Sequence, residues 1–419
     1  MKTTKIILIF IIITCFYNKL LSQNNVEIQH VKSLQECIQQ ALNNNLTLKS
    51  ERLSVEKTKD LQITAFNIEK MNFSLSQDPT SGGSPDNSFS ISQNFEFPTI
   101  YVTRRNLLKA ETEVEKSRLQ VSENEIIKEI SIIYYNLLFV KEKIKILQQQ
   151  NNIYEKFLFL ASSKLKSGET GKLEQINAEK LYNENKIAIQ NTEKNYQNLQ
   201  LLLQNLLNSN EIIAPKEDSL TIISEYHKKD NWDVSQTPQN KIFESQILVG
   251  EKNLSLQRQG FIPDINFSLR SQLLINSFNP YNIPRNYFDK GNFMGFEVGI
   301  SIPLFFGEQQ AKAKTAKKEV EIIRLRQQNA LQSIQKSYET ALNEYETAKT
   351  NLDYFQQIGN NQAKEITKIS QLLYENGEIG YIEYIQNLKT AVEMNLEYTN
   401  AINEYNQTII VLNYLESNE

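Results

Sequence analysis

The residues with the clearest potential for chemistry lie in two copies of one short motif. GETGKLE occupies residues 168–174 and GEIGYIE occupies residues 377–383, and both fit the pattern G-E-x-G-x-[LI]-E. The closing acids, Glu174 and Glu383, could attract cations. A carboxylate in the first turns of a helix is also stabilised by the helix dipole, so the two acids have a structural explanation as well.

The rest of the sequence offers no set of residues for catalysis. The two histidines, His30 and His227, lie near no cysteine, second histidine or clustered acid, so no zinc-type spacing exists. There is no Ser–His–acid set, phosphate-binding loop or dinucleotide motif. We therefore expect a protein that is not an enzyme and that uses no metal or other cofactor.

The first residues have the form of a secretory signal. Two lysines precede an apolar run over residues 6–16, which is too short to span a bilayer as a mature helix. We expect a signal peptide over residues 1–22. A retained N-terminal membrane anchor and lipidation at Cys15 are the alternatives.

The mature chain is acidic. Residues 1–22 hold three lysines and no acid, so their removal moves the formal charge from −4 to −7. An acidic chain without a basic cluster in its sequence argues against nucleic acid as a partner. Cys37 is the one remaining cysteine, so no disulfide within the chain is possible, and its amphipathic surroundings predict a small packed hydrophobe.

Long helices are predicted on both sides of each motif. Residues 99–214 and 304–419 contain no proline, and the motif glycines are the main interruption in each window. Apolar residues recur at alternating steps of four and three, which is the heptad pattern of a coiled coil. Each window predicts one helix of roughly 60 residues, ~90–100 Å long. After the motif a second, antiparallel helix follows, at about 172–208 and 381–416.

Short strands are predicted between the helices. Residues 88–97 and 295–302 alternate apolar side chains with small or polar ones, and similar stretches near residues 71–75 and 265–269 precede them. Such alternation is typical of strands with one apolar face and one polar face. A helix is also predicted before each strand pair, with a soft break at residues 43–45 in the first half.

The two halves predict an internal duplication. Positions 209 residues apart correspond in the helices, as with Glu184 and Glu393. We therefore divide the mature chain into a first structural repeat at 23–208, an equatorial linker at 209–237 and a second repeat at 238–419.

The four strands need a partner for their apolar face. A soluble sandwich would require a second sheet, which one chain does not supply. A membrane barrel shared between subunits would close the strand edges and turn the apolar face to lipid. The alternative is a soluble periplasmic coiled coil with peripheral hairpins, which leaves the alternation of the strands unexplained.

Taken together, these features resemble the TolC family of outer-membrane efflux proteins. The resemblance covers nearly all of the mature chain and rests on SLQECIQQALNNNLTLKSE, GFIPDINFSL, NFEFPTIYVTRR, GISIPLFF and the paired turns. It implies an α+β membrane protein built as a trimer. Long antiparallel coiled-coil helices would form an α-helical periplasmic barrel, and four strands per chain would contribute to a twelve-stranded outer-membrane β-barrel.

The resemblance implies a passive exit duct of a tripartite efflux system, in the outer membrane of a Gram-negative cell and extending into the periplasm. Its partners would be two further copies of the chain, a periplasmic adaptor (a membrane fusion protein), an inner-membrane pump of the RND type and outer-membrane lipid. The stretch QNFEFPTIYVTRR is most similar to the heavy-metal (CzcC/CusC-like) branch. Multidrug export and type I secretion are alternatives within the class, and a periplasmic structural coiled coil or adaptor is the alternative from another class.

By the same resemblance, the two motif turns are hairpin tips that meet the adaptor. Reversing a helix so tightly needs glycine because φ must be positive, so the turns could also be purely structural. The resemblance further implies a ring of carboxylates at the periplasmic entrance, which would favour cations and hold divalent ions that block current. The predicted tip residues are Gly168, Glu169, Thr170, Gly171, Gly377, Glu378, Ile379 and Gly380. The predicted entrance or gate residues are Glu174, Glu383, Tyr381 and Tyr384.

Overall fold

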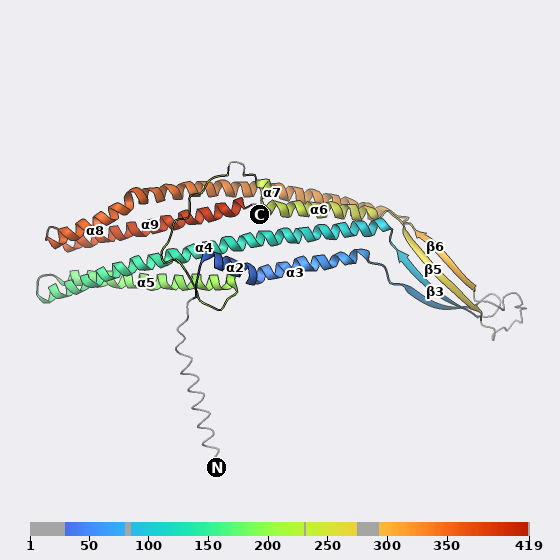
Figure 1. Cartoon of the computed structure of the whole chain (residues 1–419), viewed down its shortest axis with the longest axis horizontal. Helices are drawn as coiled ribbons and strands as arrows, with labels where there is room; N and C mark the ends of the chain where they lie inside the picture. The colour runs from blue at the N-terminus through green and yellow to red at the C-terminus, as the bar shows by residue number, and fades with distance from the viewer. Residues whose placement is uncertain (1–29, 80–84, 230–231, 275–292, 418–419) are drawn as a thin grey trace, which may run out of the picture. The chain divides into compact units, whose positions relative to one another are not determined.

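The computed structural model describes residues 30–79, 85–229, 232–274 and 293–417. The predicted signal peptide and Cys15 lie outside the described residues. Within those ranges the chain consists of long helices, one four-stranded sheet and a small strand pair (Figure 1).

Each half of the chain contains the same order of elements. The first half holds α2 (Leu34–Asn44), α3 (Leu46–Leu61), a short 3-10 helix (Gln62–Phe66), β2 (Asn72–Pro79), β3 (Pro85–Phe95), α4 (Pro98–Lys166) and α5 (Lys172–Leu207). The second half holds α6 (Pro238–Gln259), β5 (Asp264–Leu274), β6 (Phe293–Ser301), α7 (Gly307–Tyr354), α8 (Asn360–Glu375) and α9 (Tyr381–Glu416).

The predicted helices are confirmed, and their ends have local causes. Ser33 caps α2, because its hydroxyl accepts from the N–H of Glu36 while the Glu36 carboxylate accepts from the N–H of Ser33 at 2.7 Å. The predicted break at residues 43–45 is the start of α3. There the side chain of Asn45 accepts from the N–H of Thr47 at 2.9 Å, which is the role of a helix N-cap.

The second long helix differs from the prediction of an unbroken helix. A π-helical turn at Phe355–Gly359 separates α7 from α8, whereas α4 runs without interruption for 69 residues. A Cβ at position 359 would lie 2.6 Å from Cδ1 of Phe355, so the turn leaves room only for glycine. Such turns insert one residue and shift the register of the helix faces.

The four-stranded sheet is antiparallel throughout, in the order β2-β3-β5-β6. Apolar residues of neighbouring strands are paired, as in the row Phe73, Ile91, Leu269 and Phe296. This face is solvent-exposed in the single chain, with Phe73 62% and Phe296 76% exposed. The opposite face carries small and polar side chains, so the predicted alternation is confirmed.

The alternation of the sheet has exceptions, among them Ser271, which pairs with Phe89, and Gln93. Gln93 pairs with Phe267 and therefore lies in an apolar row. It is buried, and its amide donates to the carbonyl of Glu69 at 2.7 Å. The polar group is thus hydrogen-bonded within the chain, as a buried amide must be.

A second, smaller sheet was absent from the prediction. It joins β1 (His30–Lys32) and β4 (Ile213–Pro215) in parallel, with His30 opposite Ile213. Strands of three residues carry too little pattern to be recognised in a sequence. The pair ties the segment after α5 to the segment before α2.

The chain forms two compact units, and their boundaries fall within the long helices. Among the described residues, the first unit comprises those within 30–49, 122–232 and 336–417, and it holds both motif turns. The second comprises those within 50–121 and 233–335, and it holds the four-stranded sheet.

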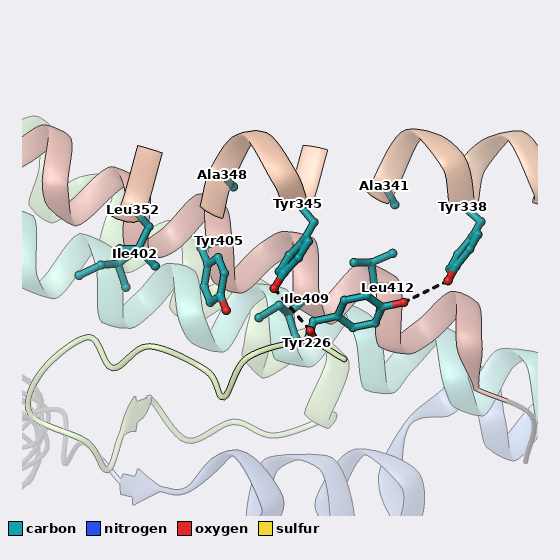
Figure 2. Close-up of a cluster of buried hydrophobic side chains, with 10 residues drawn as sticks. All are labelled: Tyr226, Tyr338, Ala341, Tyr345, Ala348, Leu352, Ile402, Tyr405, Ile409 and Leu412. Carbon is teal, nitrogen blue, oxygen red and sulfur yellow. Dashed lines mark hydrogen bonds between the residues drawn. The ribbon is translucent and has the colours of Figure 1, made fainter. Parts of the chain in front are cut away.

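The core of the first unit confirms the heptad pattern. Along α7, buried side chains recur at three- and four-residue steps and face the apolar side of α9 (Figure 2). Tyr226, from the linker between the halves, completes the cluster, and its hydroxyl lies 3.1 Å from that of Tyr338. The α7 members are Tyr338, Ala341, Tyr345, Ala348 and Leu352.

Cys37 is fully buried in α2, as predicted. Burial raises the pKa of its thiol to about 11. Across the described ranges, none of the helices combines the length and the apolar character needed to cross a membrane.

Candidate functional site

The two motif turns share one backbone geometry. Gly168 and Gly377 have φ values of +77° and +74°, in the left-handed region that favours glycine. The second glycine of each motif differs from the prediction, because Gly171 and Gly380 have φ values of −83° and −75°. Those two residues are N-caps in extended conformation, a position that many residues can occupy. The positive-φ argument therefore holds for the first glycine only.

The hydrogen bonds of the two turns also match. The N–H of Glu169 donates to the carbonyl of Lys164 at 2.9 Å, and the N–H of Glu378 donates to the carbonyl of Leu373 at 2.9 Å. In each turn the glycine N–H donates a second hydrogen bond, which spans fewer residues of the chain. The two bonds form a Schellman motif, which satisfies the last carbonyls of a helix. The duplication thus extends to the atoms of the backbone.

The side chains between the glycines fall into two matching pairs. Glu169 and Glu378 are exposed, whereas Thr170 and Ile379 are half-buried. The Thr170 hydroxyl is buried and has no hydrogen-bond partner among the described residues. Each turn therefore presents one carboxylate outward.

The closing acids of the motifs lie in the first turns of the returning helices. Glu174 belongs to the first turn of α5 and is half-buried, and Glu383 belongs to the first turn of α9 and is exposed. Within the described part of the chain, neither carboxylate forms an ion pair. The helix dipole stabilises both, and both remain free to interact with a cation.

The tyrosines near the second motif are packed in an aromatic cluster. The ring of Tyr381 stacks on Phe157 of α4 with centroids 3.3 Å apart, and Tyr384 stacks on Tyr374 at 4.6 Å with an interplanar angle of 6°. Burial, then the proximity of Tyr374 and of Glu174, raises the pKa of Tyr381. The structure thus brings three of the four predicted entrance residues, Tyr381, Tyr384 and Glu174, to this cluster, while Glu383 points to solvent.

Sequence reasoning missed two members of this cluster. Tyr374 could have been found, because the turn reverses the chain between Tyr374 and Tyr381 and brings both to the same level. Phe157 could also have been found, because it lies three residues after Tyr154 and four before Ala161, whereas Phe159 does not fit this spacing and is 72% exposed.

The aromatic cluster continues a seam that joins the two helical hairpins of the first unit. Buried side chains of α4 and α5 pack against Ile385 and Leu388 of α9. Further along, the amide of Asn403 donates to Asn136 at 3.0 Å, and the amide of Gln407 donates to the carbonyl of Ile132 at 3.2 Å. The α4–α5 hairpin and the α8–α9 hairpin are therefore attached through α4 and α9.

The duplication includes a pair of equivalent ion pairs. Lys180 and Glu184 on α5 are 3.6 Å apart, and Lys389 and Glu393 on α9 are 3.7 Å apart. Both are exposed i,i+4 pairs, which contribute little stability. They show that the two returning helices keep the same solvent-facing pattern. In the ranges that the structure describes, no group of three or more histidines, cysteines or acids is placed to hold a metal ion.

Comparisons with known proteins show which family and which solved structures this chain is similar to. Residues 244–413 match the family described as outer membrane efflux protein. No curated protein matches the sequence. A membrane protein from Pseudomonas aeruginosa has a similar structure, with a TM-score of 0.78, 14% identity, and coverage of 92% of this chain and 91% of that one.

Two further solved structures are similar. CusC, described in terms of transmembrane channel formation, gives a TM-score of 0.75 at 15% identity and covers 92% of both chains. The CmeC outer membrane channel of Campylobacter jejuni gives 0.73 at 15% identity, covering 92% of this chain and 85% of that one. At these identities the similarity shows a shared fold. Residues 244–413 thus match the outer membrane efflux protein family, and the chain as a whole shares the fold of these solved structures.

Proposed function

We propose that this protein is the outer-membrane exit duct of a tripartite efflux system. The observation that carries the proposal is the four-stranded sheet. One face of it is apolar and exposed, with Leu75 and Phe296 each 76% exposed, and no other strand among the described residues pairs with the outer edges of β2 and β6. An apolar face suits lipid, and unpaired edges call for further copies of the same sheet.

Three copies would satisfy these requirements. Each would supply four strands to a closed barrel in the outer membrane and two helical hairpins to the periplasmic part. The polar face of the sheet would line the lumen, where the serine pair Ser74 and Ser90, with hydroxyls 2.6 Å apart, would meet water. The described CmeC and CusC structures, both of channels, support this assembly.

The motif turns are the contact points for a periplasmic adaptor in this proposal. Each copy would present two tips of matching backbone, so the trimer would present six. The exposed carboxylates of Glu169 and Glu378 would lie at the outermost positions of the ring. An adaptor that binds both kinds of tip would need basic or hydrogen-bond-donating residues at each site. Energy would come from an inner-membrane pump, for which we propose the RND type.

The entrance would lie just above the tips. The carboxylates of Glu174 and Glu383, three of each in the trimer, would attract cations and hold divalent ions. The cluster of Phe157, Tyr374, Tyr381 and Tyr384 would hold the second hairpin against the first and so keep the entrance narrow. Opening would require the hairpins to separate along this seam.

We propose metal cations as the substrate class, on the basis of the strand-to-helix junction at residues 93–105 and the acids of the entrance. The chain is 15% identical to both CusC and CmeC, so sequence identity favours neither. The test must therefore compare metal salts with organic compounds. A deletion strain should be exposed to Cu, Ag, Zn, Co and Cd salts and to dyes, detergents and antibiotics.

We expect selective sensitivity to metals, restored by the wild-type gene. Broad sensitivity to amphiphiles would replace the metal proposal with multidrug export while preserving the duct. Unchanged sensitivity, with unchanged retention of all the compounds in loaded cells, would contradict an efflux role.

A further inference from the structure

A basic cavity lies in the second unit, in the helices next to the sheet. Its volume is about 580 Å³, and it is lined by residues of α3, α4 and α6 together with the 3-10 helix that follows α3. Four lysines contribute to the lining, and Glu113 is the one acid among the lining residues. The lysines are Lys59, Lys109, Lys116 and Lys252.

The lining of this cavity has more lysines than acids. Glu113 forms an ion pair with Lys116, at 2.7 Å from carboxylate oxygen to Nζ. In the described part of the chain, Lys59, Lys109 and Lys252 form no ion pair with an acid. Three ammonium groups therefore converge on one cavity from three different helices without a counter-charge, and their mutual repulsion would be relieved by a bound anion.

Two further polar groups of the cavity, on Gln62 and Thr112, are joined by hydrogen bonds. The amide of Gln62 donates to the hydroxyl of Thr112 at 2.8 Å, and that hydroxyl donates to the carbonyl of Leu108 at 3.0 Å. This chain of hydrogen bonds fixes the floor of the cavity between the 3-10 helix and α4. The groups left to bind a ligand are the lysine ammoniums and the amide of Asn106. The ammoniums are donors only, so they favour an acceptor-rich anion.

We propose that this cavity binds a phosphate group. A phosphate carries several acceptor oxygens around one centre and can meet three ammonium groups at once, whereas a single carboxylate offers only two oxygens. The cavity has the volume of a small-molecule site, so the phosphate can carry a substituent such as glycerol.

The position of the lysines bears on the source of the phosphate. Lys59 lies two residues before the end of α3, Lys252 seven before the end of α6, and Lys109 eleven after the start of α4. At 1.5 Å per residue, they lie roughly 3–17 Å along the helices from the ends that lead into the strands. If the strands lie in the outer membrane, which rests on the function proposed above, the strand-side end of the cavity lies next to the headgroups of the periplasmic leaflet. An anionic phospholipid is then one source of the phosphate, and a soluble phosphate compound is the other.

The test uses the purified full-length protein in detergent. The cavity variant is Lys59→Gln/Lys109→Gln/Lys252→Gln. The matched control is Lys314→Gln/Lys317→Gln/Lys318→Gln, three exposed lysines of α7 that do not line the cavity. Native mass spectrometry would measure binding of phosphatidylglycerol, and isothermal titration calorimetry would measure binding of glycerol 1-phosphate and of inorganic phosphate. Subunit composition, read from the same spectra, tests the duct proposal independently.

We expect the cavity variant to bind on the order of 100-fold more weakly than wild type, from a few-fold loss per lysine, and the control to stay within about twofold of wild type. Loss confined to phosphatidylglycerol would identify a lipid site, and loss of glycerol 1-phosphate binding would identify a soluble ligand. The proposal is overturned if both variants bind every probe as wild type does, or if wild type binds none of them.

Discussion

The ring of Phe157 stacks on the ring of Tyr381 with centroids 3.3 Å apart, which joins the first helical hairpin to the start of the returning helix of the second. The contact lies between the two motif turns and the rest of the α4–α9 seam. In a duct whose entrance opens by separation of the hairpins, this stack is among the contacts that must break.

Replacing Phe157 with leucine should weaken the closed entrance. The substitution keeps an apolar side chain and removes the aromatic pair, which contributes ~0.5–1.5 kcal/mol beyond burial. We expect a higher conductance in planar bilayers and a lower thermal midpoint. Phe159→Leu is the matched control, because Phe159 is two residues away and 72% exposed. Equal behaviour of the two variants would show that the stack does not hold the entrance.

Replacing Glu383 with alanine should change ion passage and lower stability only by the lost interaction with the helix dipole, ~0.3–1 kcal/mol. The exposed carboxylate forms no ion pair in the described part of the chain, so its loss removes charge from the entrance and leaves packing intact. We expect higher conductance and weaker block by divalent cations in a planar bilayer. Glu365→Gln, an exposed acid on α8, should leave both unchanged. If Glu383→Ala leaves divalent block at the wild-type level, the carboxylate ring has no role in ion passage.

Alanine should lower stability more at the first glycine of each motif than at the second. Gly168→Ala and Gly377→Ala place a side chain at positive φ, which costs about 1–2 kcal/mol each. Gly171→Ala and Gly380→Ala lie at negative φ with no atom within 4 Å of the new Cβ, so only the poorer N-cap preference of alanine should lower stability, and the loss should be smaller. Thermal unfolding of the four variants would measure the difference. Equal losses at all four positions would mean that the turn conformation described above is wrong.

The stability contribution of Cys37 should depend on pH. Burial raises the pKa of the thiol from 9.0 to about 11, so the folded state holds the proton more tightly than the unfolded state. The associated stability is fully present below pH 9 and is lost as pH rises from about 9 to 11. The unfolding midpoint of wild type should therefore fall more steeply over this range than that of Cys37→Ala. If the unfolding midpoints of the two proteins fall in parallel as the pH rises, the raised pKa of Cys37 is contradicted.

Much of the fold could be predicted because its pattern is long and repeated. Sustained heptads predicted α5 and α9 to within a residue, and strict alternation predicted the sheet. The π-turn at Phe355–Gly359 was missed, because the apolar spacing on each side of it still has the form of heptads, although the inserted residue shifts the register between the two stretches. The pair β1–β4 was missed, because three residues on each side carry no periodic signal.

The candidate site could be predicted only in part. The duplicated motif pointed to Glu174 and Glu383, and their places in the first helical turns follow from the turn itself. The heptad spacing favours Phe157 over Phe159 as a buried residue, but its contact with Tyr381 depends on how α4 and α9 pack, which the spacing does not show. The lysines of the basic cavity come from three separate helices, so no local stretch of sequence shows them together.

The account rests most directly on the claim that three copies form one passive duct in the outer membrane. Membranes should be fractionated, and the protein extracted from the outer membrane should be analysed by native mass spectrometry and reconstituted into planar bilayers. The account predicts an outer-membrane trimer with a steady, voltage-independent conductance. A soluble periplasmic monomer, or a trimer that conducts no ions, would contradict it.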